Sequence, residues 1–231
     1  MKSGSPPVGF MKKQTPSSRP VIGVTGGVGS GKTAFTRELE RLGAKVLDAD
    51  RIARRLVDED PPVREGLRKA FGAGVFDGSG NLKRSQLAER VFSDPAQLHL
   101  LNGVIWPALI SVIETAIREH RESGDPAPLV VDMAVLYEAG CERLFDTVVA
   151  VEAPLEKRVQ RLSVSRGWDE TKIRRRMSSQ MDIREKSQKA DWTVQNDGTL
   201  HDLALKAHSV YLEILHRFDK GGRFPSRGDF P

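Results

Sequence analysis

Five short apolar runs alternate along the chain with longer segments in which apolar residues recur at helical spacing. Continuous apolar runs of this length are typical of strands that are buried on both faces. Strands that alternate with helices predict right-handed crossover connections and a parallel sheet covered on both sides. The pattern therefore predicts an α/β fold of three layers, with a five-stranded parallel sheet in the middle. The expected strands are 21–25, 45–48, 129–132, 147–152 and 192–195.

Two long excursions interrupt this alternation. The first separates the second and third runs and has helical patterning, with helices expected at 50–57, 62–71, 84–92 and 95–121. Pro107 should kink or break the last of these, because proline removes a backbone donor and clashes with the preceding turn. The second excursion is polar and rich in arginine, and Asp169 is placed to cap a helix in it. The expected divisions are a core at 20–50, 121–164 and 191–216, a helical insertion at 51–120, a second insertion at 165–190, and tails at 1–19 and 217–231.

The composition is that of an ordinary globular chain, since 39% of the 231 residues are hydrophobic. No apolar run approaches the roughly 18 residues needed to span a bilayer. The first twenty residues lack the apolar stretch of a secretory signal. Cys141 is the only cysteine, which excludes a disulfide within the chain and fits a reducing compartment. We expect a cytoplasmic protein without a membrane segment, in which Cys141 is an ordinary thiol.

The net charge of +5 is concentrated in two regions. Residues 1–20 carry four lysines and arginines and no acid, and 158–189 hold ten against four acids. The remainder of the chain is acidic on balance. A basic tail and one basic patch do not form the extended basic surface that nucleic acid requires. The charge therefore predicts an anionic small ligand near the patch and no nucleic-acid partner.

Residues 26–33 read GGVGSGKT and match the phosphate-binding loop pattern G-x-x-x-x-G-K-[ST] at every specified position, between an expected strand and an expected helix. Glycines let successive N–H groups turn inward, and the helix N-terminus adds a positive end. Lys32 is expected to reach the β- and γ-phosphates of a nucleotide, and Thr33 to bind Mg²⁺. The alternative is a glycine-rich turn with a chance Lys-Thr pair. The expected nucleotide contacts are Gly26, Gly27, Val28, Gly29, Ser30, Gly31, Lys32, Thr33 and Ala34.

The loop predicts nucleotide binding without choosing the reaction, because GTPases, ATPases and small-molecule kinases all use it. Acids at the carboxyl ends of neighbouring parallel strands meet at one crevice. A kinase needs a carboxylate beside the acceptor hydroxyl, and Asp50 is our candidate, with Asp48 nearer the metal. Asp132 ends the third run, where a Walker B carboxylate holds Mg²⁺. The alternatives are a helix cap for Asp50 and chance placement of an acid at a strand end for Asp132.

Seven arginines lie between 158 and 184. Arg158 and Arg161 are three positions apart on an expected helix and share a face. For any single arginine, an ordinary solvated basic face is the alternative. Phosphoryl transfer spreads negative charge over the transferring oxygens, and a mobile lid that carries arginine can neutralise it while excluding water. Arg161 is our catalytic candidate and Arg166 our candidate for contact with the nucleotide.

Five segments together resemble the dephospho-coenzyme A kinase family, over nearly the whole folded chain from about Val21 to about Leu203. The phosphate loop alone is generic, whereas DADRIAR and the closing segment in this order are specific. The matching segments are TGGVGSGKT at 25–33, DADRIAR at 48–54, GNLKRSQLAERVFSD at 80–94, RRRMSSQM at 174–181 and KADWTVQNDGTL at 189–200.

The resemblance implies a P-loop kinase fold related to the nucleoside monophosphate kinases, in which 51–120 hold the substrate and 165–190 form the lid. It implies transfer of the γ-phosphate of ATP, with Mg²⁺, to the 3′-hydroxyl of dephospho-coenzyme A. Asp50 would be the acceptor-site carboxylate, and Asn196 in the closing segment would join the nucleotide site. Arg54 and Arg84 would meet the pyrophosphate of the substrate, with surface salt bridges as the alternative. We expect a monomer or a weak homo-oligomer.

The chain departs from the family pattern at three positions. The family usually has histidine where this chain has Trp106, proline where it has Ala134, and a hydroxyl residue where it has Ala34. Trp106 puts in doubt any role for that histidine here. The nearest rival is another P-loop kinase, which acts on a nucleoside monophosphate or a small metabolite. A switch or nucleic-acid-binding NTPase is the more distant rival, and the N-K-x-D motif expected of a GTPase does not occur.

Overall fold

The computed structural model describes residues 19–220, and most of both expected tails lies outside this range. Arg19, expected in the first tail, donates hydrogen bonds to the backbone carbonyl of Pro126 (3.0 Å) and to Asp219 (2.6 Å). Residues 217–219, expected in the second tail, form the last turn of helix α9 (Leu200–Asp219). The folded core is therefore slightly longer at both ends than the sequence predicts.

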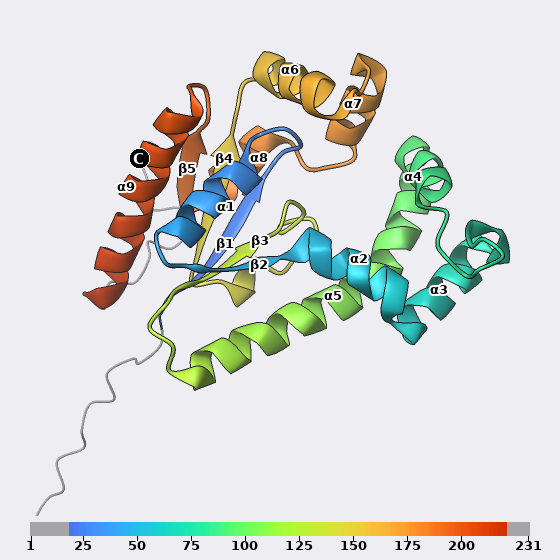
Figure 1. Ribbon diagram of the computed structural model, residues 1–231, viewed down its shortest axis with the longest axis horizontal. Helices are drawn as coiled ribbons and strands as arrows, with labels where there is room; N and C mark the ends of the chain where they lie inside the picture. Colours follow the sequence, from blue (N-terminus) through green and yellow to red (C-terminus); the bar gives the residue numbers. More distant parts are fainter. Residues whose placement is uncertain (1–18, 221–231) are drawn as a thin grey trace, which may run out of the picture.

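A sheet of five parallel strands forms the centre of the fold (Figure 1). The strand order is β2-β3-β1-β4-β5, and all neighbouring pairs are parallel. The five expected strands are confirmed, and only the first is one residue longer than predicted. The strands are β1 (Val21–Gly26), β2 (Lys45–Asp48), β3 (Leu129–Asp132), β4 (Thr147–Glu152) and β5 (Trp192–Gln195).

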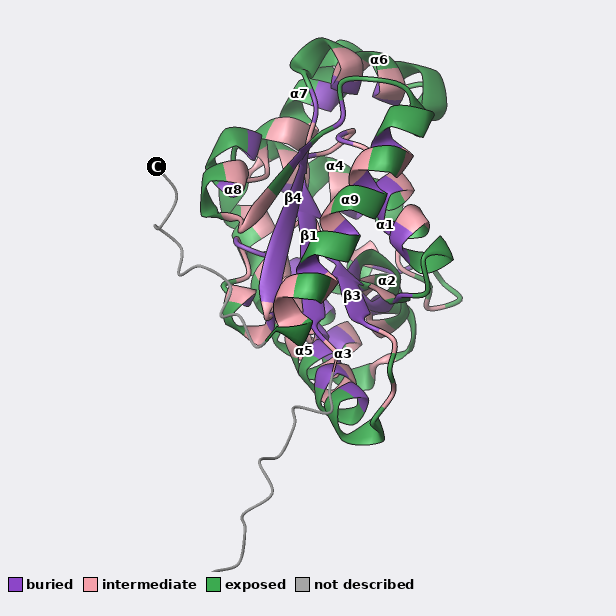
Figure 2. Cartoon of the chain, turned by 90° about the vertical axis from the view of Figure 1, so that its left-hand side faces the viewer, coloured by how far each residue is buried: buried purple, intermediate pink, exposed green. Residues whose placement is uncertain are grey.

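Helices cover both faces of the sheet, as its continuous apolar runs predict. On one face α1 (Lys32–Arg41) and α9 pack together through side chains such as Phe35 and Tyr211. On the other face lie the end of α5 (Pro95–Ser123), α8 (Ile183–Lys189) and the segment after β3. Figure 2 shows the three middle strands, β1, β3 and β4, as buried almost throughout. The predicted three-layer α/β fold is confirmed.

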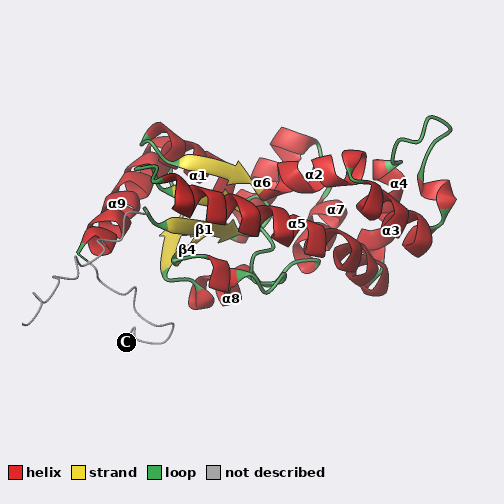
Figure 3. Cartoon of the chain, turned by 90° about the horizontal axis from the view of Figure 1, so that it is seen from below, coloured by secondary structure: helices red, strands yellow, loops and turns green. Residues whose placement is uncertain are grey.

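The helices of the first insertion lie beyond the carboxyl edge of the sheet (Figure 3). They bury an apolar cluster of their own, which includes Val63, Leu67 and Val91. This cluster is distinct from the two that flank the sheet, so the insertion is a packing unit in its own right. Its elements are α2 (Ala49–Glu59), α3 (Pro61–Phe71), a 3₁₀ turn (Ala73–Val75), α4 (Arg84–Ser93) and the first part of α5.

Helix α5 runs across Pro107 without interruption, so the proline does not break it. Residues before the proline pack in the insertion cluster, and Leu109 and Ile113 after it pack against the sheet. By length and composition alone, α5 is also the one helix within 19–220 that could cross a membrane, which the apolar runs did not predict. Few residues in the apolar part of α5 are fully buried. Its partly buried apolar residues pack in the insertion cluster and in the cluster against the sheet. Helix α5 thus joins the insertion to the core.

The second insertion faces the first across the carboxyl edge of the sheet. Helix α6 (Leu155–Arg166) leads into it from the core, α7 (Glu170–Ser178) lies within it, and α8 returns the chain to the sheet. Asp169 accepts a hydrogen bond from the backbone N–H of Lys172 at 2.7 Å, which confirms the predicted helix cap. Helix α7 lies opposite α4 of the first insertion (Figure 1).

Candidate active site

The phosphate loop joins β1 to α1, and its backbone admits only glycine at two positions. Gly29 and Gly31 have φ angles of 78° and 92°, in the left-handed region that side chains rarely adopt. A methyl group on Gly31 would also collide with the side-chain amide of Asn196. Within the described chain, no side chain caps the N-terminus of α1 at Gly31. The first N–H groups of α1 therefore remain available to an anion.

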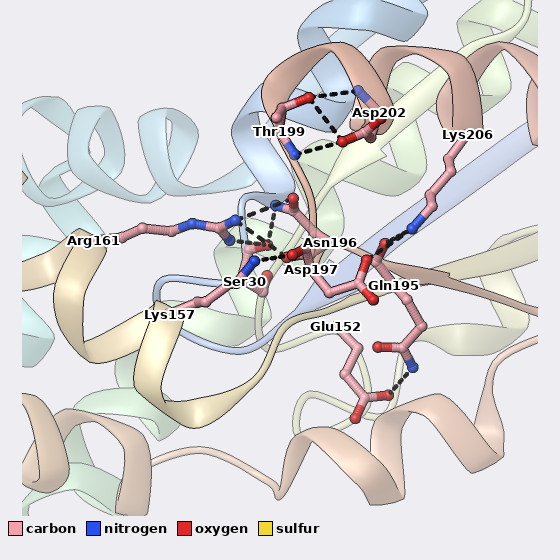
Figure 4. A network of polar contacts seen from close by, with 10 residues as sticks. All are labelled: Ser30, Glu152, Lys157, Arg161, Gln195, Asn196, Asp197, Thr199, Asp202 and Lys206. Carbon is pink, nitrogen blue, oxygen red and sulfur yellow. Dashed lines mark hydrogen bonds and ion pairs between the residues drawn. The ribbon is translucent and has the colours of Figure 1, made fainter.

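Side chains from outside the loop bind its backbone carbonyls, and the two shortest of these contacts come from Arg158 and Asn196. Arg158 of α6 is buried and donates from Nε to the carbonyl of Val28 at 2.9 Å. Asn196, directly after β5, is 3% exposed and donates from Nδ2 to the carbonyl of Ser30 at 2.7 Å (Figure 4). In a trans peptide the carbonyl of one residue and the N–H of the next point in opposite directions. These contacts therefore turn the N–H groups of Gly29 and Gly31 toward the inside of the loop.

The segment that carries Asn196 is itself anchored on two sides (Figure 4). Lys206 of α9 donates to the Asp197 carboxylate at 2.9 Å. Thr199 and Asp202 form a reciprocal capping box at the start of α9. The backbone around Asn196 is thereby fixed before any ligand binds, so its amide is held in place for the phosphate loop.

Arg161 lies one helical turn beyond Arg158 and reaches the same loop. Its guanidinium donates to the carbonyl of Ser30 at 3.4 Å, and to the backbone carbonyl and side-chain oxygen of Asn196 at 3.1 and 3.2 Å (Figure 4). Arg161 also lines the cleft described below. Its charge therefore lies beside the place where the phosphates of a nucleotide would bind.

Lys32 forms an ion pair with Asp132 at the end of β3. Asp132 is 5% exposed and also accepts a hydrogen bond from the hydroxyl of Thr36 at 3.0 Å. Burial lowers the pKa of Lys32, and the nearby carboxylates of Asp50 and Asp48 partly offset this effect. Because β3 lies next to β1, the sheet brings Asp132 under the phosphate loop, where a Walker B carboxylate is expected.

The two acids Asp48 and Asp50 have different surroundings. The strand ends at Asp48, and α2 begins at Ala49. Asp48 accepts a hydrogen bond from the backbone N–H of Arg51 at 3.0 Å, so the helix cap is Asp48 and not Asp50. Asp50 lies in the first turn of α2 and lines the cleft together with Lys32.

A cleft of about 490 Å³ extends from the phosphate loop toward the first insertion. Its walls come from the loop, from α2 and α5 of the first insertion, from the segment after β3, and from α6 and α7. Trp106 and Ala134, two of the three departures from the family pattern, both face this cleft. Among the predicted site residues, its lining includes residues 27–33 of the loop, Asp50, Arg54, Arg161 and Arg166.

Arg176 of α7 closes one end of the cleft. Its guanidinium carbon lies 3.4 Å from the centre of the Phe92 ring and 5.8 Å from that of Trp168. Burial and the charge of Arg166 lower the pKa of Arg176, and Asp50 raises it in part. Cation–π contacts of this kind are worth about 0.5–2 kcal/mol. The contact with Phe92 joins the second insertion to the first across the cleft.

Arg84 does not line the cleft. Its guanidinium lies 2.6 Å from the Asp58 carboxylate and 3.3 Å from the backbone carbonyl of Arg54. The side chains of this ion pair are 44% and 53% exposed. The structure therefore places Arg84 in a surface salt bridge between α4 and α2, the alternative that the sequence left open.

Sequence analysis assigned no role to several residues of this site. Arg158 carried a signal, because it lies three positions before Arg161 on one helix face, but its burial against Val28 could not be foreseen. Phe92 and Trp168 carried none, since their contacts with Arg176 join segments far apart in the sequence. The cleft is also lined by Leu98, Leu101, Asn102, Val135, Leu162, Ser165, Ser179 and Gln180.

The donors for a metal ion are few. Between residues 19 and 220, no group of three or more His, Cys, Asp or Glu side chains is arranged to hold a metal. Magnesium that is bound with nucleotide phosphates takes only one or two protein ligands, and water and phosphate oxygens supply the rest. The hydroxyl of Thr33 and the carboxylate of Asp132 fit this requirement, whereas Asp48 is used as a helix cap.

Comparison with known proteins identifies the family. A model of the family described as dephospho-CoA kinase matches residues 20–202. The chain belongs to the dephospho-CoA kinase family. The dephospho-CoA kinase of Corynebacterium glutamicum is 39% identical over 200 residues, which are 85% of this chain and 98% of the relative. That of Salinibacter ruber is 37% identical over 193 residues, 84% of this chain and 96% of the relative.

Solved structures agree with this assignment. A crystal structure of a Thermus thermophilus protein superposes with a TM-score of 0.69 at 34% identity, covering 85% of this chain and 98% of the other. The dephospho-CoA kinase from Campylobacter jejuni gives a TM-score of 0.62 at 24% identity, covering 85% and 97%. The latter likeness shows the fold alone. As a member of the dephospho-CoA kinase family, the protein is a kinase, and ATP is its phosphoryl donor.

Proposed function

We propose that the protein transfers the γ-phosphoryl group of ATP to the 3′-hydroxyl of dephospho-coenzyme A, which yields coenzyme A and ADP, the last step of coenzyme A biosynthesis. One observation carries the proposal: a single cleft is lined by the phosphate loop, by Asp50 and by the arginines of α6. Membership of the family supports the choice of acceptor. The first insertion, 51–120, is the proposed acceptor domain, and the second, 165–190, is the proposed lid.

The phosphates of ATP bind against the N–H groups of the loop and the N-terminus of α1. Lys32 exchanges the Asp132 carboxylate for β- and γ-phosphate oxygens when the nucleotide is present. Asn196 acts on the nucleotide site through the Ser30 carbonyl, because its amide is already bonded there. The proposed contacts are Gly26 to Ala34 and Arg166, with Asn196 as their support.

Asp50 orients the 3′-hydroxyl and accepts its proton as the bond to phosphorus forms. Arg54 lies one turn further along α2 and lines the same cleft, so it meets the pyrophosphate of the acceptor. Arg84 lies outside the cleft and supports Arg54 by a hydrogen bond to its backbone carbonyl. The acceptor site is thus built mainly on α2.

Arg161 and Arg166 neutralise the charge that develops on the transferred phosphoryl group. Both belong to α6 and line the cleft on the side of the phosphate loop. Arg176 and Trp168 shield the far end from water, and a drier cleft strengthens each of these electrostatic contacts.

Magnesium is the proposed metal, with Thr33 as its direct ligand and Asp132 as its second protein group. When bound, the ion would offset part of the negative charge of the nucleotide phosphates. Once Lys32 turns to the phosphates, the Asp132 carboxylate is available to the ion. We assign no metal role to Asp48.

A cytoplasmic location is part of the proposal. Cys141 is buried, and burial raises the pKa of its thiol to about 11, so it is held as an unreactive thiol. We propose no nucleic-acid or membrane partner, and a monomer or weak homo-oligomer as the active form. Size-exclusion chromatography with light scattering at two protein concentrations tests the last point.

The deciding experiment measures ADP release from ATP·Mg²⁺ after addition of dephospho-coenzyme A, with AMP, CMP, adenosine and shikimate as parallel acceptors. We expect turnover with dephospho-coenzyme A only, and a product whose new phosphate ³¹P NMR assigns to the 3′ position. A preference for AMP, CMP or shikimate would retain the kinase chemistry and overturn the acceptor. Absence of ADP release with every acceptor would contradict the proposal.

A further inference from the structure

Lys186 of α8 is a fully buried cation that none of the steps above uses. Its side chain is 0% exposed. The ammonium lies 2.6 Å from the backbone carbonyl of Ala134 and 2.7 Å from Oε1 of Glu138. Burying such an ion pair costs much of what the pairing returns, and an apolar side chain of similar size often stabilises a fold at least as well. The pair therefore points to a role beyond packing.

The Ala134 carbonyl belongs to the wall of the cleft. Ala134 and Val135 both line the cleft, directly after β3. The same carbonyl accepts a second hydrogen bond, from the hydroxyl of Thr25 at 3.0 Å. Thr25 is the residue before the first glycine of the phosphate loop. One carbonyl thus connects β1, the cleft wall and, through Lys186, helix α8.

Glu138 extends the connection to the end of the second insertion. Its Oε1 accepts a hydrogen bond from the backbone N–H of Met181 at 2.9 Å. Met181 follows Ser179 and Gln180, which line the cleft after α7. Lys186 and Glu138 together therefore fix the segment after β3 relative to the segment that ends the proposed lid.

The phosphate loop has separate supports. Arg158 and Asn196 hold its carbonyls through hydrogen bonds that involve neither Lys186 nor Glu138. Loss of the buried pair should therefore leave the loop in place. The walls at 134–135 and 179–180 should lose their fixed relation to each other.

We infer that Lys186 is a positioning residue for phosphoryl transfer, whose ammonium holds the cleft walls at 134–135 and 179–180 in the arrangement that receives the acceptor. The inference rests on the proposed function and deepens it. On this inference Lys186 affects kcat/KM for the acceptor and leaves the affinity for ATP unchanged. A merely structural residue would affect both substrates alike.

The test compares variants of the full chain by steady-state kinetics with dephospho-coenzyme A and by calorimetric titration with ATP·Mg²⁺. Lys186→Met alone leaves the Glu138 carboxylate buried without its ion partner and can fail to fold. The double variant Lys186→Met/Glu138→Gln removes both charges; glutamine has the shape of glutamate, and methionine is one atom shorter than lysine. We expect it to retain a cooperative thermal transition, to lose about tenfold or more in kcat/KM for the acceptor, and to keep Kd for ATP within about twofold.

Lys189→Met is the matched control. Lys189 lies on the same helix and pairs at 2.9 Å with Glu185, but both side chains are about half exposed. This variant should have the kcat/KM and the ATP affinity of the wild type, because exposed ion pairs contribute little to stability. Lys186→Arg, which keeps the charge, should recover part of the acceptor kcat/KM. A folded double variant with wild-type kinetics, or one that loses ATP affinity and acceptor use in parallel, would overturn the inference. Absence of transfer by the wild type would instead overturn the proposed function.

Discussion

The side-chain amide of Asn196 and the backbone carbonyl of Ser30 are joined by a buried hydrogen bond of 2.7 Å across 166 positions of the chain. The bond links the end of the last strand to the middle of the phosphate loop. It also leaves no space for a side chain on Gly31. The closing segment is therefore a structural part of the nucleotide site.

Replacing Asn196 by alanine should weaken ATP binding. The substitution leaves the Ser30 carbonyl with the longer contact from Arg161, at 3.4 Å, so the Gly31 peptide is held less firmly. The loss of one buried hydrogen bond costs about 1–1.5 kcal/mol. We expect Kd for ATP to rise about fivefold to tenfold in calorimetric titration. Asn81→Ala, which removes a contact with Asp77 in an exposed turn, is the control and should have no effect. An unchanged Kd in Asn196→Ala would show that the bond is not needed to shape the loop.

Gly31→Ala should abolish measurable ATP binding, whereas Gly43→Ala should not affect it. Both glycines have positive φ angles, 92° and 98°, so an alanine at either one carries a similar backbone cost of about 1 kcal/mol. Only at Gly31 does the added methyl meet Asn196, since nothing lies within 4 Å of one on Gly43. Thermal unfolding should therefore shift more in Gly31→Ala than in Gly43→Ala, and titration with ATP should show a loss of affinity in Gly31→Ala only. Equal ATP affinities would contradict the steric argument.

The fold could be predicted largely from the apolar runs, because the three middle strands are buried on both faces and read as continuous runs. The phosphate loop was predicted for a similar reason, since all its residues are contiguous. Long-range contacts were not predictable in this way. Lys186 and Glu138 give no local signal, and the contact of Arg176 with Phe92 arises from side chains brought together by the crossovers. The start of the helix after the second strand was predicted to within one residue, since it was expected at 50 and lies at Ala49. The sequence did not show that Asp48, and not Asp50, would cap this helix.

Lys32→Met should abolish phosphoryl transfer and weaken ATP binding. The ammonium is the only charged group of the loop motif, and the variant also leaves Asp132 buried without its ion partner. We expect kcat to fall by about a thousandfold or more, as for removal of one major electrostatic contact with the transition state. Lys45→Met, at an exposed pair with Asp125, is the control for loss of a lysine. A kcat near that of the wild type in Lys32→Met would disprove the assignment of the loop.

Substitutions of Arg54 and of Arg84 should have different effects on KM for the acceptor, although both were predicted from the sequence as substrate contacts. Arg54→Met should raise KM for the acceptor about tenfold, because a pyrophosphate loses a charged partner in the cleft. Arg84→Met breaks an exposed pair with Asp58 and should lower the melting temperature slightly, with KM within about threefold. Steady-state kinetics with the acceptor as the varied substrate makes the comparison. A larger effect from Arg84→Met would place the pyrophosphate on the outer face of α2.

A comparison of Asp50→Asn with Asp48→Asn tests whether Asp50 accepts the proton of the substrate hydroxyl. The two acids are two positions apart but have different surroundings. Asp50 lines the cleft, whereas Asp48 caps α2. An asparagine at 50 keeps the shape and cannot take a proton from the acceptor, so kcat should fall by about a hundredfold to ten-thousandfold while Kd for ATP is kept.

Asparagine is itself a good helix cap, so Asp48→Asn should change both stability and kcat little. Measurement of kcat together with ATP titration for both variants gives the answer. If Asp48→Asn is the slower enzyme, the proton acceptor or the metal ligand lies at the strand end and not in the first turn of α2. If both variants turn over as fast as the wild type, neither carboxylate takes the proton, and the acceptor hydroxyl is oriented by the arginines of the cleft.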